Sequence, residues 1–381
     1  MLAQRGTLGV LAAIVAGLAV SAGVVAVAGA IRGPRETTTR LVAEDASAPL
    51  SRVAIHYAPA SDKGALPVWR DLFRALPPTV NVDVEVSEAP DYDRFISKLE
   101  AVHVPHLDRF HRVVVGAPIT TWSRDRYAAL VDADGHGSIL APPRVQTAFK
   151  KRAGDAESPT AISNALYGVA PHVSRIVFEG GDLAATPNLL FADANLQHRN
   201  EATTNASRDE IEDELHMRFA QRIVWLGEQS GDVPRHHIMM YMMPIDDHTV
   251  AVGDERLGLS LLANEPDNGL ELEDPVAEAG RFDRAAAILV AQGFKVIRVP
   301  ALVLKGAGSF VTYTNALFDR RGDQRIVYLP TYALPSLDDA ATAFWQGQGF
   351  EVHPVDVSNI YQMNGSLGCL VNVTRRAAPG S

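Results

Sequence analysis

The chain has 381 residues, of which 47% are hydrophobic and 21% are charged, so it is long and apolar enough to bury a globular core. Its formal net charge is −10, which argues against a nucleic-acid partner because phosphate binding needs a basic face. With one cysteine, Cys369, the chain cannot form an intramolecular disulfide, and a lone thiol does not build a zinc site by itself.

The first feature in chain order is an apolar segment, residues 8–31, that contains no charged side chain. A membrane-spanning helix needs roughly 20 such residues, whereas the apolar region of a cleavable signal peptide has roughly 7–15. We therefore predict that residues 1–32 form an N-terminal membrane anchor, with a cleaved signal segment as the alternative. The expected location is a membrane-anchored protein with an extracytoplasmic domain, or an exported, periplasmic protein after cleavage.

After this segment, residues 33–50 are polar and irregular and predict a linker, and residues 51–381 predict an α/β domain. Short apolar or alternating runs predict strands. These runs are 53–57, 81–86, 113–115, 175–178, 249–252, 295–299, 325–329 and 351–355. Helical patterns fall between them, at 92–103, 205–226, 281–292 and 338–348. Ser207 and Glu210 have the spacing of a capping box.

Two of the predicted units repeat the order helix, Gly-Phe, strand. The first passes through Gly293 and the second through Gly349, and a glycine after a helix is a natural stop signal. Repetition of β and α elements favours a symmetric α/β array over one doubly wound sheet.

Three polar segments interrupt the apolar pattern: 122–127, 178–183 and 235–241. Singly, each is accounted for by a surface ion pair, a solvated turn or a satisfied polar side chain. Cys369, taken alone, is equally well explained as a small buried hydrophobe. Together with Cys369, the three segments supply a nucleophile, a base, a carboxylate partner for the base and an acid that binds a cation, which is the inventory of a thiol-dependent hydrolase.

In order along the chain, the motifs are Trp-x-Arg-Asp, Phe-Glu-Gly-Gly-Asp, a histidine before an apolar strand, and a cysteine after a glycine-rich turn. This order resembles the guanidine-modifying (pentein) superfamily, and within it the agmatine deiminases and bacterial-type peptidylarginine deiminases. The resemblance implies a five-bladed α/β propeller of ββαβ-type units around a central pocket.

The resemblance also implies roles for particular residues. Cys369 would attack the guanidinium carbon, His237 would act as acid and base, Glu179 would orient His237, and Asp125 would bind the guanidinium. Four more residues would bind substrate: Trp122, Arg124, Asp182 and Asn364. A carboxylate matches a guanidinium through paired hydrogen bonds, and a nearby cation favours the reactive thiolate. No metal or organic cofactor is implied.

The sequence departs from the family pattern at Met239, where many relatives carry a second guanidinium-binding carboxylate. A second departure is Gly368, directly before the cysteine, where deiminase relatives often carry a histidine. The predicted function is a cysteine-dependent hydrolase, or deiminase, of a guanidino or amidino compound. Agmatine, arginine, peptidyl arginine and methylated guanidines all remain candidates. The alternatives are an amidinotransferase on the same fold and a non-catalytic, membrane-tethered binding protein, and His236 is the alternative base to His237.

Overall fold

In the computed structural model, which describes residues 39–144, 150–265, 268–306 and 308–377, the strands gather into five sheets. The first sheet has the order β1(Arg40–Leu41), β5(Ala128–Val131), β6(Gly137–Ala141), β7(His172–Val173). The second has the order β10(Arg222–Leu226), β9(Leu189–Asp193), β8(Ala184–Ala185). The third has the order β11(Met242–Pro244), β12(Thr249–Asp254), β13(Lys295–Val303), β14(Phe310–Thr312). The fourth is β15(Leu317–Arg321), β16(Gln324–Thr331), β17(Phe350–Asp356), and the fifth is β18(Val371–Arg376), β2(Leu50–Tyr57), β3(Asn81–Val86), β4(Phe110–Val114).

Each sheet contains the same three-strand unit, in which a central strand has one antiparallel and one parallel neighbour. In the fourth sheet, for example, β16 pairs antiparallel with β15 and parallel with β17. The central strands of the other four units are β2, β6, β9 and β12. Parallel neighbours need a long crossover, which explains why helices follow each central strand.

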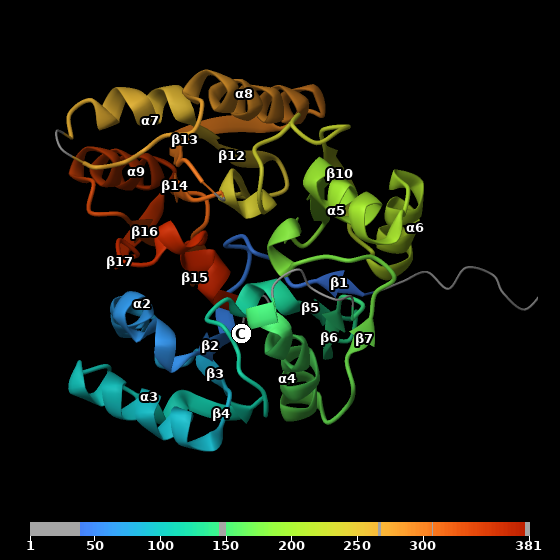
Figure 1. Cartoon of the computed structure of the whole chain (residues 1–381), viewed down its shortest axis with the longest axis vertical. Helices are drawn as coiled ribbons and strands as arrows, with labels where there is room; N and C mark the ends of the chain where they lie inside the picture. Colours follow the sequence, from blue (N-terminus) through green and yellow to red (C-terminus); the bar gives the residue numbers. More distant parts are fainter. Residues whose placement is uncertain (1–38, 145–149, 266–267, 307, 378–381) are drawn as a thin grey trace, which may run out of the picture. The chain divides into compact units, whose positions relative to one another are not determined.

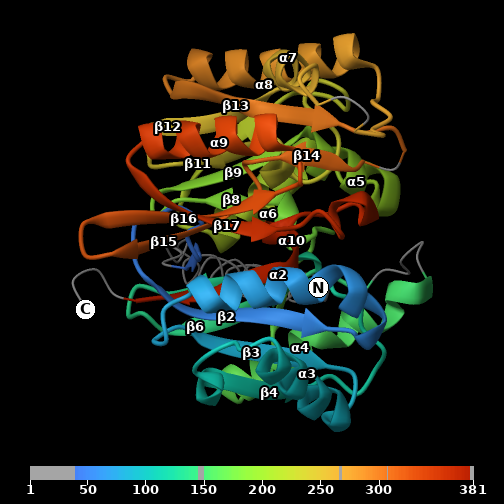
Figure 2. The ribbon, with the colours of Figure 1, turned by 90° about the vertical axis from the view of Figure 1, so that its left-hand side faces the viewer.

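The helices lie between these strands in the sequence. They are α2(Asp62–Ala75), α3(Ala89–Ala101), α4(Ser158–Tyr167), α5(Ala194–Thr204), α6(Arg208–Arg218), α7(Glu255–Leu262), α8(Pro275–Ala291), α9(Pro335–Gly347) and α10(Leu367–Leu370). Helix α3 packs on β3 and β4, and helices α7 and α8 cover the sheet that contains β13 (Figures 1 and 2). Burial of apolar side chains between helix and sheet is the main stabilising contribution in such layers.

The fifth sheet joins the two ends of the described chain. Strand β18, near the C-terminus, pairs antiparallel with β2, with Val371 opposite Ile55. Cys369 lies in the short helix α10, directly before β18. The pairing therefore ties the cysteine to the start of the domain, far from it in sequence.

Most of the predicted elements are confirmed. Strand β3 spans the predicted residues 81–86, and a strand covers all or most of six other predicted runs. Ser207 and Glu210 form the expected capping box at the start of α6. Gly293 and Gly349 follow their helices with φ of 92° and 80°, values that glycine adopts without strain.

Two predicted elements are wrong. Residues 175–178 form no ladder, because side chains take their backbone groups: Asn200 bonds both the N–H and the carbonyl of Val177, each at 2.8 Å. The predicted helix 205–226 divides into α6 and the strand β10. The β-formers Ile223, Val224 and Trp225 pair with β9 there, so tertiary pairing decides against the helix.

Residues 39–50, expected as part of a linker, belong to the folded unit. Leu41 pairs with Leu130 and is buried. The expected membrane-anchored location is corrected, because among the residues that the structure describes no helix has the length and apolar character needed to cross a bilayer. The segment for which a spanning helix was predicted, residues 8–31, lies outside the described residues.

Candidate active site

The four predicted catalytic residues occupy equivalent places in different sheets, on or directly before short turns that precede the antiparallel neighbour of the central strand. Turn η3(Ser123–Arg126) precedes β5, turn η5(Gly180–Asp182) precedes β8, turn η6(Ile238–Met240) precedes β11, and α10 precedes β18. Consecutive members of the series α10, η3, η5, η6 contact one another. The turns therefore bring together residues that are widely separated in the sequence.

A pocket of about 410 Å³ lies where these turns meet. It is lined by Trp122, Asp125, Arg152, Glu179, Arg199, His236, His237, Met363, Asn364 and Cys369. Six of the eight predicted site residues are in this set. The size suits one small molecule or one side chain.

His237 is held by a carboxylate from a neighbouring turn. Its Nε2 lies 2.9 Å from Glu179 Oε2, whereas the carboxylate makes no such contact with the adjacent His236. Gly181 permits this close approach, because a Cβ there would lie 2.5 Å from His237 Nδ1. That Nδ1 is buried and accepts or donates no hydrogen bond among the described residues, so the bond to Glu179 is the one that orients the ring.

The electrostatics of the pair favour an imidazolium and a carboxylate. Burial lowers the pKa of His237, but its contacts with Cys369 and Glu179 outweigh burial and raise the pKa well above its usual value. Burial raises the pKa of Glu179, but the bond from His237 and the charge of Arg199 reverse this and hold the pKa far below its usual value. Both shifts have the sign of a stable ion pair.

We expect this ion pair to make stability depend on pH. The folded-state pKa of Glu179 is depressed, so its contribution to the free energy of unfolding is present above the unfolded value of 4.5 and is lost as pH falls below it. Between pH 6 and pH 3, the wild type should lose on the order of 2 kcal/mol more stability than Glu179→Gln. Urea denaturation at several pH values measures this difference.

The matched control is Glu351→Gln, which removes an exposed carboxylate 2.7 Å from His353. An exposed pair of this kind contributes little, so the control should follow the wild type at every pH. A Glu179→Gln variant that loses stability in parallel with the wild type down to pH 3 would contradict the assignment of the ion pair.

Cys369 lines the pocket and is 3% exposed. Its Sγ is 3.7 Å from Asn315 Oδ1 and 3.9 Å from Met240 Sδ. Asn315 also accepts the backbone N–H of Gly368 at 3.2 Å, so it fixes the turn that carries the thiol. We did not predict Asn315; its place shortly before β15, in a fifth segment equivalent to the four turns above, is a signal that could have found it.

Asp125 is buried beside a second carboxylate and a basic side chain. Arg152 Nη2 pairs with Asp125 Oδ2, and Arg152 Nη1 lies 3.6 Å from Glu179 Oε1. Burial and the negative charge of Glu179 raise the pKa of Asp125, while His237 and Arg152 oppose this effect. A buried and a half-buried carboxylate in one pocket need a neighbouring cation, and Arg152 supplies it.

Two predicted substrate-binding residues lie outside the pocket. Arg124 is buried and pairs with Glu44 at 2.6 Å, which fastens the N-terminal segment to η3. Asp182 accepts the backbone N–H of Glu179 at 2.8 Å and pairs with Arg199 at 3.1 Å. Both contacts are structural: they position the turns and leave neither side chain available to a ligand.

Three basic residues of the pocket were not assigned to it from the sequence. Arg152 ends a Lys-Lys-Arg run that is typical of a solvated surface, and Arg199 lies in α5 among polar residues. His236, considered only as an alternative base, is half-buried with a φ of 86°, and burial of its ring followed by the charge of His237 lowers its pKa to about 3. A neutral His236 is poorly suited to orient or stabilise a charge.

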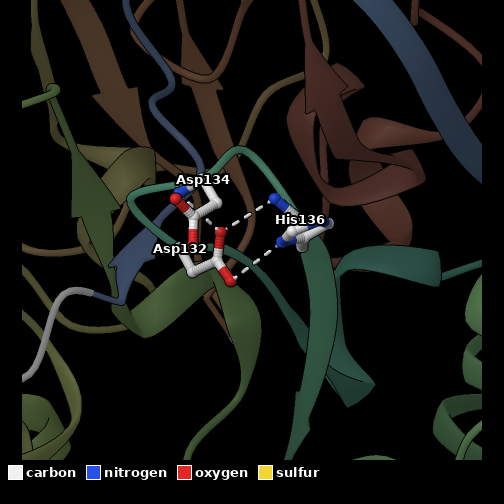
Figure 3. Close-up of side chains that lie close together, drawn as sticks. All are labelled: Asp132, Asp134 and His136. Atoms are coloured by element: carbon white, nitrogen blue, oxygen red, sulfur yellow. Dashed lines mark hydrogen bonds and ion pairs between the residues drawn. The ribbon is translucent and has the colours of Figure 1, made fainter.

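A separate cluster of acidic and basic residues lies in the turn between β5 and β6. Figure 3 shows Asp132, Asp134 and His136 close together there. Asp132 Oδ1 accepts the backbone N–H groups of Asp134 and His136 at 2.9 and 2.8 Å. These bonds account for the cluster as a hairpin turn.

Comparison with known proteins identifies the fold and the family. An agmatine deiminase of C. jejuni with substrate bound has a TM-score of 0.65 and 15% identity, over 89% of this chain and 97% of its own. The agmatine deiminase of Enterococcus faecalis has a TM-score of 0.61 and 14% identity, over 91% and 99%. A comparison with curated protein sequences returned no match. The model of Porphyromonas-type peptidyl-arginine deiminases matches residues 54–373, so the chain belongs to this family of the pentein superfamily.

Proposed function

We propose that the protein is a cysteine-dependent hydrolase of a guanidino or amidino compound. The observation that carries the proposal is one pocket that combines Cys369, the His237–Glu179 pair and Asp125. A nucleophile, an oriented acid-base group and an anion for a cationic substrate are the three components that such a reaction needs. Membership of a deiminase family supports the same reaction class.

In the proposed reaction, the Cys369 thiolate attacks the central carbon of the substrate and forms a tetrahedral adduct. The imidazolium of His237 donates its proton to the departing nitrogen, the C–N bond breaks, and an amidino-thioether remains on Cys369. Water then loses a proton to His237 and attacks the same carbon, which breaks the C–S bond. The products are a urea derivative, ammonia or an amine, and the free thiolate.

The electrostatics of the pocket support this sequence. The raised pKa of His237 provides an imidazolium near neutral pH, which stabilises an adjacent thiolate. Glu179 keeps the imidazole ring in one orientation through both steps, because its carboxylate stays ionised. Trp122 forms a wall of the pocket, and its ring fits against Gly365, where a Cβ would lie 2.3 Å from it.

We further propose that the five sheets are the blades of a propeller, with the turns at their inner ends forming the site. The repeated three-strand unit and the equivalent positions of the site-bearing turns support this arrangement. Candidate substrates are agmatine, peptidyl arginine, methylated guanidines and neutral guanidines such as nitroguanidine.

The test is ammonium release from this panel by the full chain, with acid-quenched samples analysed by mass spectrometry. We expect ammonium or amine in proportion to the ureido product, and an amidino adduct on the peptide that contains Cys369. Chloroacetamide, a neutral alkylating agent, shows in parallel whether the thiol can be reached. An accessible thiol with no product and no adduct from any compound would overturn the proposal.

A further inference from the structure

A guanidinium group of the protein itself lies against the carboxylates of the pocket. Arg152 pairs through Nη2 with Asp125, and its Nη1 lies 3.6 Å from Glu179. The planar fork of a guanidinium matches carboxylates in this manner, and a substrate guanidinium would require the same partners. Arg152 therefore occupies the place that the proposed function assigns to a cationic substrate.

The position of Arg152 is built into the fold. The turn η4(Lys150–Glu157) approaches the backbone so closely that a Cβ on Gly154 would lie 1.9 Å from the carbonyl oxygen of Pro118. Asp155, fully buried, accepts the N–H and the hydroxyl of Thr120 at 2.6 and 2.7 Å. Its Oδ2 also accepts Arg152 Nε at 3.3 Å, so three carboxylates hold this one side chain.

Once Arg152 is paired, the other charged groups of the pocket disfavour binding of a second guanidinium. Asp125 Oδ1 is the only oxygen of that carboxylate without a partner among the described residues. Position 239, two residues after His237, is a buried methionine and supplies no carboxylate. Arg199 adds a further positive charge, 3.2 Å from Glu179. An entering cation would reach one free oxygen and would lie beside two fixed cations, which repel it.

We propose that Arg152 determines specificity by competing with cationic guanidines for Asp125. The inference rests on the proposed function, because it concerns the binding step of the same site. A cationic guanidine must displace Arg152 before it binds, whereas a neutral guanidine or amidine does not meet this competition. Removal of Arg152 opens a cavity that is complementary to a free guanidinium ion.

The experiment is guanidinium rescue of the full chain carrying Arg152→Gln, followed by thermal unfolding. Guanidinium chloride at roughly 10 mM is far below denaturing concentrations. We expect the variant to bind guanidinium at least about tenfold more tightly than the wild type, since each charge-assisted bond favours the bound ion. At roughly ten times the dissociation constant, Tm should rise by about 2–4 °C in the variant alone.

Urea is the ligand control, because it is planar and of similar size but neutral, and equal concentrations of NaCl control for ionic strength. Arg144→Gln is the matched variant: it removes an arginine paired with Glu157 at 2.7 Å on the surface of the same segment. Neither the matched variant nor the wild type should respond to guanidinium differently from NaCl.

Equal guanidinium responses of Arg152→Gln and the wild type would overturn the inference. If the variant does not fold, refolding with guanidinium or with urea decides the question: recovery with guanidinium alone supports the inference, and recovery with neither or with both contradicts it. Thermal unfolding and refolding report guanidinium binding without any catalytic turnover. Rescue by guanidinium, together with an accessible thiol that gives no product and no adduct from any compound of the substrate panel, would leave Arg152 as the occupant of a guanidinium site and would remove the proposed hydrolase function.

Discussion

Replacement of Cys369 by serine should abolish product formation from any guanidine that the wild type hydrolyses. A serine hydroxyl in the same pocket is a far weaker nucleophile than a thiolate beside His237, so we expect kcat to fall by about 10⁴-fold or more. Product formation is measured as ammonium release, with the adduct on residue 369 followed by mass spectrometry.

The chain itself provides the control for this substitution. Cys369 is the only cysteine, so thiol alkylation reports on that residue alone and should disappear in Cys369→Ser. The side chain is nearly isosteric, and Asn315 Oδ1, 3.7 Å from Sγ, offers a partner to the hydroxyl, so Tm should change little. Ammonium release that persists in a folded, unalkylated variant would remove Cys369 from the mechanism.

The second large effect is expected from His237→Asn, which removes the group that transfers the proton. Loss of general acid-base catalysis lowers kcat by roughly 10²–10⁴-fold. Because the leaving nitrogen must be protonated for the C–N bond to break, we expect the amidino adduct to form more slowly as well. Rapid-quench measurement of adduct and product separates the two steps.

His236→Asn is the matched comparison, because the two histidines are adjacent and both line the pocket. Asparagine tolerates the positive φ of position 236, so this variant should keep the backbone conformation. Glu179 bonds His237 and not His236, and we therefore expect the effect at 236 to be less than tenfold. A larger loss at 236 than at 237 would reverse the assignment of the base.

Local patterns were sufficient to predict much of the secondary structure. Strand β3 follows from strict alternation, and the start of α6 follows from the Ser207–Glu210 spacing. The failures occur where long-range contacts supply the hydrogen bonds: Asn200 takes the backbone groups of residue 177, and β9 draws residues 222–226 into a sheet. Such partners are not visible in a local window of sequence.

The candidate active site shows the same difference between what local sequence patterns predict and what long-range contacts decide. The order of short motifs along the chain predicted six residues that the structure brings to one pocket. The error at Arg124 arose because the motif gives a residue's position in the chain but not the direction of its side chain, which points to Glu44. Asn315 and Arg199 were missed because their local sequence resembles that of ordinary polar turns and helices.

By itself, then, the sequence determined which chemical groups the candidate site contains: one thiol, a histidine and two carboxylates. It also showed that position 239 carries a methionine and no acid. Only the tertiary structure decided which charges meet, because an ion pair depends on distance and burial. A basic run that has every appearance of a solvated surface delivers Arg152 to Asp125 and Glu179. Under the competition that we propose, this contact favours guanidines and amidines that do not need the carboxylate held by Arg152.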